Sequence, residues 1–411
     1  MKILQVNTSV NMGSVGRRAE DIGNMLIRKG HESYVAVSSR LKRPSTSKLI
    51  TIGNQYDVLL HGIKSRVFDR QGYGSKKATQ NFVKRIIEID PDVIHLRNIH
   101  GYYLNIEVLF NYLAEANKPV VWSFHDCWPF TGHCAYFDKM NCYKWKTECY
   151  ECPGLSSYPK SFGVDNSKAN YALKKRLFTS VKNMTPVGVC HWIGDHLKES
   201  FFKNYPIEVI YNGINTEVFN PDSDVNSLRS ELQLTDEKII LGAANVWNSR
   251  KGLANFKGLD DFIEISRKLP PKVKIVLIGP TKEQQKDFPS NIIGVDRTNN
   301  LEYLASFYRM ADVFVNPTYV DNFPTTNIEA LSSGTPAVVY RTGGCPEAVD
   351  TNTGIVVEKG DRDGLLKGVL TILDNGKESY TKLCRERALK YFDRKDNNEA
   401  YFNLYERLLA K

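Results

Sequence analysis

The stretch ADVFVNPTYVDNFPTTNIEALSSGTP, residues 311–336, constrains the fold of this chain more than any other. Its β-branched apolar run at 312–316 predicts a buried strand, and apolar residues at helical spacing over 327–333 predict a helix that Gly334 and Pro336 end. The apolar run 337–340 predicts a second strand. Strand, loop, helix and strand form a βαβ unit, so we expect an α/β fold whose ligands bind at the carboxyl ends of the strands.

Two carboxylates follow the first of these strands. Asp321 lies in the loop, and Glu329 lies eight residues later in the first turns of the helix. The helix begins near Thr325 and Thr326, where unpaired N–H groups and the helix dipole favour an anion. An anion site beside carboxylates that accept hydroxyl hydrogen bonds suits a sugar attached to a diphosphate. The alternative is that Glu329 caps or solvates its helix and Asp321 is a turn residue.

Length and composition limit the class of protein to which this chain can belong. The 411 residues suffice for two domains, and no apolar run approaches the ~20 residues of a membrane-spanning helix. The start MKILQVNTSV lacks the pattern of a secretion signal, so we expect a cytoplasmic protein with reduced cysteines.

Charge is distributed unevenly along the chain. Residues 1–204 carry 29 Lys and Arg against 17 Asp and Glu, a net charge of +12, whereas residues 205–411 carry 26 against 29, a net charge of −3. The basic half predicts attraction to an anionic membrane face or to a lipid-diphosphate acceptor; a plainly solvated surface is the alternative. Nucleic acid is a poorer candidate, because no binding motif accompanies the charge.

The N-terminal half repeats the α/β alternation. A strand at 3–7 runs into Gly13 and Gly16, which predict either a turn that brings backbone N–H groups to a phosphate or an ordinary tight turn. Residues 40–74 are basic and aromatic and predict a long irregular loop. A buried strand at 120–124 delivers His125 to its carboxyl end.

A cysteine cluster follows. Within nineteen residues the chain has Cys134, Cys142, Cys149 and Cys152. Four thiolates can hold a structural zinc ion, with Cys127 and His133 as competing ligands; reduced, packed cysteines are the alternative. A redox pair lacks the surrounding pattern of a thioredoxin.

The 321–336 stretch resembles the E-x7-E motif and EAL-x-x-G-x-P tail of retaining GT-B glycosyltransferases of family 4, with Asp321 in place of the first Glu. Residues 209–221, VIYNGINTEVFNP, resemble the crossing between that family's two domains. The resemblance implies two Rossmann-like domains facing across a cleft. We expect an acceptor-binding domain at 1–204, a donor-binding domain at 205–392, and a terminal helix at 393–411 that returns to the first domain.

The same resemblance implies residue roles. Glu329 would hold the nucleotide ribose, while Asp321 and His125 would hold the transferred sugar. Arg250 and Lys251 would stabilise the leaving diphosphate, although Lys257-Gly258-Leu259 repeats Lys251-Gly252-Leu253 and makes Lys257 a rival. Further donor-binding positions are expected at Gly13, Gly16, Thr325, Thr326, Asn327 and Gly344.

The activity that the family implies is retaining sugar transfer from a nucleotide-diphosphate sugar. The acceptor would be a saccharide or a lipid-linked saccharide of surface polysaccharide assembly, and no metal would be needed for catalysis. The basic N-terminal half adds the expectation that the protein lies peripherally on the inner face of the membrane. A nucleotide-sugar epimerase of the same fold and a non-catalytic sugar-nucleotide-binding subunit are the alternatives.

Overall fold

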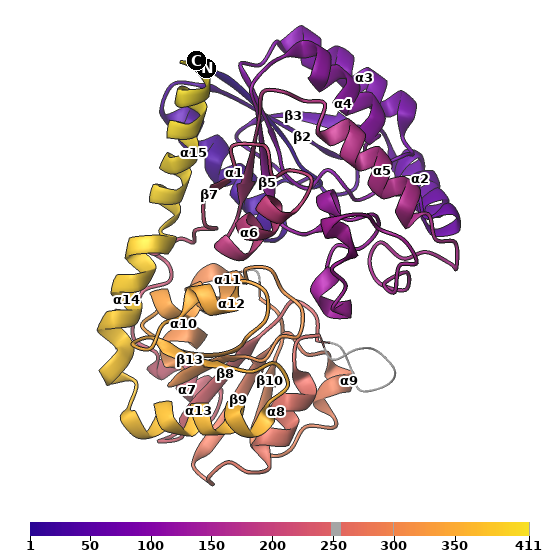
Figure 1. Ribbon diagram of the computed structural model, residues 1–411. Helices are drawn as coiled ribbons and strands as arrows, with labels where there is room; N and C mark the ends of the chain where they lie inside the picture. Colours follow the sequence, from indigo (N-terminus) through magenta and orange to yellow (C-terminus); the bar gives the residue numbers. More distant parts are fainter. Residues whose placement is uncertain (248–255, 299, 411) are drawn as a thin grey trace. The chain divides into compact units, whose positions relative to one another are not determined.

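The computed structural model describes residues 1–247, 256–298 and 300–410, which form two compact units (Figure 1). The N-terminal unit comprises Met1–Tyr211 and Asn398–Lys411, and the C-terminal unit comprises Asn212–Asn397. Each unit has a parallel sheet flanked by helices, which confirms the predicted α/β class. None of the described helices is long and apolar enough to cross a bilayer.

The described residues of the N-terminal unit form a seven-stranded sheet in the order β3-β2-β1-β4-β5-β6-β7. Its strands are β1 (Lys2–Val6), β2 (Glu32–Ser38), β3 (Lys48–Ile52), β4 (Val93–Leu96), β5 (Val120–Phe124), β6 (Met184–Gly188) and β7 (Glu208–Val209). Its helices are α1 (Gly13–Arg28), α2 (Gln55–Phe68), α3 (Lys76–Ile89), α4 (Ile106–Ala116), α5 (Ser167–Phe178) and α6 (His191–Glu199). The strand order reverses between β1 and β4, where Ile3 pairs with Val93, so loops diverge there and leave room for a ligand.

The C-terminal unit repeats this plan with six strands among its described residues, in the order β10-β9-β8-β11-β12-β13. The strands are β8 (Lys238–Ala243), β9 (Val273–Ile278), β10 (Ile292–Val295), β11 (Val313–Asn316), β12 (Ala337–Tyr340) and β13 (Gly354–Val357). The helices are α7 (Asn226–Glu231), α8 (Leu259–Ser266), α9 (Lys282–Gln285), α10 (Leu301–Met310), α11 (Thr325–Ser332), α12 (Cys345–Ala348), α13 (Arg362–Asn375) and α14 (Glu378–Phe392). Here the order reverses between β8 and β11.

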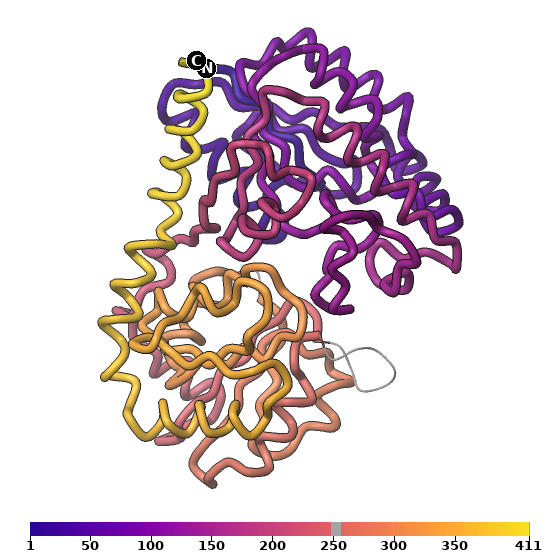
Figure 2. Tube along the Cα trace, viewed as in Figure 1, coloured from indigo at the N-terminus to yellow at the C-terminus, as the bar shows by residue number. Residues whose placement is uncertain are grey.

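The C-terminal half of the last helix, α15 (Arg394–Leu409), packs into the core of the N-terminal unit. Tyr401 and Tyr405 are buried there with Ile3 and Ile22 of β1 and α1. Their hydroxyls reach the sheet, because Tyr405 lies 2.6 Å from His95 Nδ1 and Tyr401 lies 2.8 Å from Ser123 Oγ. The expected return of the terminal helix is confirmed, and the trace begins and ends at one corner of this unit (Figure 2).

The predicted loop at 40–74 is wrong, because it contains β3 and α2. Asn54 and Asp57 start α2 with a reciprocal cap, in which each side chain accepts a hydrogen bond from the other residue's backbone N–H. His61 ties the helix to the following turn, since its Nε2 accepts the N–H groups of Gly72 and Gly74. These side-chain interactions fix a helix that, apart from Val58, turns its large apolar residues away from the core.

Candidate functional site

The carboxyl ends of β8 and β11 bring a lysine and a carboxylate together. Lys257 precedes α8, and its Nζ donates a hydrogen bond to Oδ2 of Asp321 in the loop after β11, at 2.6 Å. Burial alone would lower the pKa of Lys257, but the charge and hydrogen bond of Asp321 outweigh burial and raise it. The lysine therefore stays a cation in this partly buried place.

Two glycines permit the close backbone approach that forms this site. Gly258, with φ of +74°, lies against Pro317, and a Cβ there would stand 2.4 Å from the Pro317 carbonyl oxygen. Gly343, with φ of +51°, lies against Asp321, and a Cβ there would stand 1.9 Å from the Asp321 carbonyl oxygen. The N–H of the next residue, Gly344, donates to the carbonyl of Asn322 at 2.7 Å. Side chains at Gly258 or Gly343 would push these loops apart.

The N-terminus of α11 belongs to the same cluster. Asn327, in its first turn, is buried, and its Oδ1 accepts a hydrogen bond from Nδ2 of Asn316 at the end of β11, at 2.7 Å. The buried thiol of Cys345 hydrogen bonds with Asn327 and lies near both Asp321 and Lys257; burial and the Asp321 charge raise its pKa. The first N–H groups of α11 have no partners within the helix, so the cluster combines a cation with a helix N-terminus.

Glu329 lies one turn further along α11 and is only 7% exposed. Its Oε2 accepts a hydrogen bond from the hydroxyl of Tyr308 in α10, at 2.9 Å. Burial and the neighbouring carboxylate raise the pKa of Tyr308, so this hydroxyl remains a donor. Glu329 is thus oriented by a fixed partner, as a carboxylate that receives hydroxyl groups must be.

In the N-terminal unit, His125 follows β5 beside a pair of polar side chains. Burial, together with the nearby charge of Arg97, lowers the pKa of His125 to about 3, so the imidazole is neutral at physiological pH. The next residue, Asp126, accepts a hydrogen bond from the Trp128 N–H and lies 2.6 Å from His100 Nε2. Burial opposes ionisation of Asp126, but His100 outweighs it and leaves the pKa of Asp126 below its ordinary value.

The two glycines predicted to line the first loop lie at the start of α1. Gly13 has φ of +63°, and a Cβ at Gly16 would stand 2.7 Å from Ser9 Oγ. The N–H of Asn11 donates to the carbonyl of Gly16 at 3.0 Å, which closes the loop onto the helix. The tight turn is present; a phosphate contact there stays a prediction.

The predicted zinc site is not supported by the geometry. The four cysteines line one small pocket and, like the other four, are free thiols. The thiol of Cys134 hydrogen bonds with Cys152 and lowers its pKa to about 7, whereas Cys149 Sγ accepts the N–H of Gly132 at 3.2 Å. No group of three or more His, Cys, Asp and Glu in the described residues is placed to hold a metal ion.

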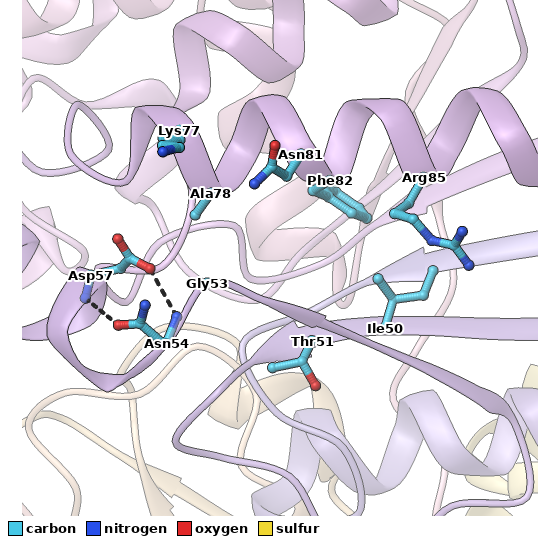
Figure 3. A pocket seen from close by; sticks show the side chains of 10 residues that line it. All are labelled: Ile50, Thr51, Gly53, Asn54, Asp57, Lys77, Ala78, Asn81, Phe82 and Arg85. Carbon is cyan, nitrogen blue, oxygen red and sulfur yellow. Dashed lines mark hydrogen bonds between the residues drawn. The ribbon is translucent and has the colours of Figure 1, made fainter.

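A separate pocket of about 380 Å³ lies at the carboxyl end of β3, between the start of α2 and α3 (Figure 3). Its lining residues are Ile50, Thr51, Gly53, Asn54, Asp57, Lys77, Ala78, Asn81, Phe82 and Arg85. Asn54 and Asp57 face each other there because they cap α2. In the described part of the chain, none of the predicted site residues lines this pocket.

Of the predicted site residues, Asp321, Asn327, Glu329 and Gly344 lie together in the C-terminal unit, with Thr325 and Thr326 starting the same helix. Gly13, Gly16 and His125 lie in the N-terminal unit. Arg250 and Lys251 lie outside the described residues. Tyr308 was missed because it occupies an ordinary apolar position of α10, whereas Asn316, at the end of a predicted strand, offered a usable signal.

Known proteins are similar to this chain along most of its length. Residues 15–218 match the sequence profile described as Glycosyltransferase Family 4, and residues 242–375 match the profile Glycosyl transferases group 1. The chain is 24% identical over 375 residues to a protein of Escherichia coli named as a colanic acid biosynthesis glycosyl transferase, WcaC, with 87% of this chain and 88% of that protein covered.

Solved structures share the fold over the full length. Sucrose-phosphate synthase from Thermosynechococcus elongatus superimposes with a TM-score of 0.72 at 17% identity, with 100% of this chain and 99% of that chain covered. HepE from Anabaena, crystallised in complex with UDP, gives a TM-score of 0.69 at 15% identity, with 99% and 100% of the two chains covered. WaaG, a glycosyltransferase involved in lipopolysaccharide biosynthesis, gives 0.63 at 16% identity, with 97% and 99% covered.

Proposed function

Because the chain is a GT-B glycosyltransferase of family 4, we propose that it transfers a sugar from a nucleoside-diphosphate donor with retention of anomeric configuration. The observation that carries the proposal is the Lys257–Asp321 pair beside the N-terminus of α11, with the buried Glu329 on the same helix. A cation and helix-end N–H groups suit a diphosphate, and the carboxylates suit ribose and sugar hydroxyls. One neighbour in fold, HepE, has been crystallised with UDP-glucose, a donor of this class.

In the reaction we propose, the acceptor hydroxyl attacks the anomeric carbon from the face that the diphosphate leaves. The bond from that carbon to the phosphate oxygen breaks as the new glycosidic bond forms, and the hydroxyl proton passes to the departing phosphate. Negative charge grows on the leaving oxygen. Lys257, with Arg250 and Lys251 as further cations, stabilises it, so transfer proceeds without a divalent metal.

Each carboxylate has its own task in this scheme. Glu329, held by Tyr308, binds the ribose of the nucleotide, and Asp321 binds a hydroxyl of the transferred sugar while it orients Lys257. His125 binds the transferred sugar as a neutral imidazole, which can donate one hydrogen bond and accept another. Gly13, Gly16, Thr325, Thr326, Asn327 and Gly344 contribute backbone and side-chain contacts to the donor.

We propose a saccharide or lipid-linked saccharide of surface polysaccharide assembly as the acceptor. The likeness to WcaC along 88% of that protein supports this class. The excess of basic residues in 1–204 supports an acceptor or membrane surface that carries negative charge.

Acceptor-dependent release of nucleoside diphosphate tests the proposed function. Common nucleotide sugars are first screened for thermal stabilisation of the full chain, and the stabilising donor is then incubated with lipid-linked saccharide extracts, with and without EDTA. We expect nucleoside diphosphate to appear only with acceptor, unaffected by EDTA, and the product to keep the donor's anomeric configuration by NMR. Release without any acceptor would favour the epimerase, and donor binding with no release under any condition would favour the non-catalytic subunit.

A further inference from the structure

Helix α2 carries its apolar side chains on the face that points away from the protein. Six large apolar residues of its fourteen are exposed: Tyr56, Leu59, Leu60, Ile63, Val67 and Phe68. Tyr56 is 77% exposed and Leu60 65% exposed. The buried face instead has small or polar residues together with one valine, namely Val58, His61, Gly62 and Ser65. The usual direction of amphipathicity in a globular protein is therefore reversed.

The exposed residues form one stripe. At the helical repeat, Tyr56, Leu59, Leu60, Ile63 and Val67 fall within an arc of about 100°. Figure 1 shows α2 at the periphery of the N-terminal unit, and in the described part of the chain it makes only slight contact with other helices and strands. Nothing in the packing of the unit accounts for this stripe.

A second exposed segment extends the apolar surface at the end of α2. Phe162 is 64% exposed, and its N–H donates to the carbonyl of Arg66 at 2.8 Å. Val164 follows it, also exposed, and Asn166 Nδ2 donates to the carbonyl of Phe68 at 2.6 Å. The turn at 162–164 is thus fixed against the last turn of α2, and both present apolar side chains to solvent.

Cations border this surface on both sides. At the helical repeat, Lys64 falls beside one edge of the stripe and Arg66 beside the other, and both are exposed. Lys160 lies next to Phe162, with its Nζ 5.6 Å from the centre of that ring. The acidic residue of α2, Asp57, is occupied in the N-terminal cap. Apolar side chains flanked by long cationic ones match a bilayer with anionic headgroups, since lysine and arginine extend to the phosphates while the apolar face enters the acyl boundary.

From this geometry we propose that α2 and the 162–164 turn insert into the interface of an anionic membrane, with Leu60 and Ile63 at the centre of the contact. A protein partner is favoured less, because lysine is depleted from protein interfaces, whereas two of the three flanking cations, Lys64 and Lys160, are lysines. The inference makes the proposed membrane partner specific and does not depend on the transfer chemistry.

The test is sedimentation of the full chain with phosphatidylcholine vesicles, with and without phosphatidylglycerol. The double substitution Leu60→Glu with Ile63→Glu is compared with Leu383→Glu with Leu389→Glu, two exposed apolar positions of α14 in the other unit. We expect binding to the anionic vesicles, reduced about tenfold or more by the α2 pair and unchanged by the α14 pair. Lys64→Gln with Arg66→Gln should weaken binding and its salt dependence together.

Two controls separate this inference from its rivals. All variants should melt at the wild-type temperature and bind nucleoside diphosphate equally, so failure of vesicle binding would leave the proposed transfer untouched. Equal vesicle binding by both glutamate pairs, or no binding by the wild type, would overturn the inference. So would a wild-type dimer in light scattering that the α2 pair converts to a monomer, because the stripe would then be covered by a second copy.

Discussion

At the scale of single residues, the ion pair between Lys257 and Asp321 sets the charge of the candidate donor site. Two adjacent Lys-Gly-Leu repeats compete for the role of phosphate cation, and the contact with Asp321 favours the second. The close approach of Gly258 to Pro317 supports the same choice, because only glycine fits there. Lys251 remains a further cation in the proposal.

We predict that Lys257→Met lowers the turnover number about a hundredfold or more, because it removes a cation from the leaving diphosphate. Steady-state rates of nucleoside-diphosphate release measure this. The matched control is Lys268→Met, which breaks the exposed Lys268–Asp363 pair and should leave the rate unchanged. If Lys251→Met is crippling while Lys257→Met is mild, the assignment of the cation is wrong.

Substitution of the two carboxylates should have different effects on nucleotide binding and on transfer. Glu329→Ala should weaken binding of the free nucleoside diphosphate by about 1.5–3 kcal/mol, since a charge-assisted hydrogen bond to the ribose is lost. Asp321→Ala should instead depress transfer with a smaller effect on the free nucleotide. Calorimetry with nucleotide and nucleotide sugar distinguishes the two patterns, and intact transfer in Asp321→Ala would show that Asp321 is an ordinary turn residue.

Residues of the candidate site were predictable where their separation along the chain is typical of a known motif. Asp321 and Glu329 follow a recognisable strand at a fixed separation, so both could be found from the sequence. Tyr308 could not, because its partner Glu329 lies in another helix and a buried tyrosine at an apolar position resembles any core residue. The structure does not support the zinc expectation, because cysteine spacing alone does not show how the sulfur atoms are arranged.

At the scale of elements, short turns position the site residues. The turn after β12 lies against the Asp321 loop through Gly343, whose backbone has a left-handed conformation with no room for a side chain. The parallel strands themselves were predictable from apolar runs. Helix α2 was not, because its apolar face points to solvent and its fixed contacts are a side-chain cap and a buried histidine.

We predict that Gly343→Ala lowers both stability and donor affinity, because the added Cβ would lie 1.9 Å from the Asp321 carbonyl oxygen. The control is Gly360→Ala, where φ is also positive, at +87°, but the nearest atom would be 3.6 Å away. Urea unfolding and nucleotide titration of both variants measure the difference. Equal effects would mean that backbone conformation alone, and not the contact with Asp321, is responsible.

At the scale of the whole molecule, three histidines with lowered pKa values link stability to pH. Burial lowers the pKa of His61 to about 4 and of His125 to about 3, and holds the pKa of His95 well below its ordinary value. Unfolded histidines bind protons below about pH 6.5, whereas these three stay neutral when folded. The unfolded chain therefore binds more protons, and acid favours it.

We predict that the free energy of unfolding falls as the pH drops from 6.5 towards 4. Each histidine contributes a slope of up to about 1.4 kcal/mol per pH unit, or about 4 kcal/mol per unit for the three together. Urea unfolding of the full chain at pH 7, 6 and 5 measures the slope. A stability that is constant over this range would show that these histidines are protonated in the folded protein.

We propose that the C-terminal unit binds a nucleoside diphosphate through Lys257 and Glu329. Titration calorimetry of the full chain with UDP, GDP and ADP tests it most directly, with Lys257→Met, Glu329→Ala and the control Lys268→Met measured beside the wild type. We expect the wild type and the control to bind one of these nucleotides with equal affinity, and each site variant to bind it about tenfold more weakly or worse. Equal affinity in all four proteins, or no binding of any nucleoside diphosphate by the wild type, would contradict it.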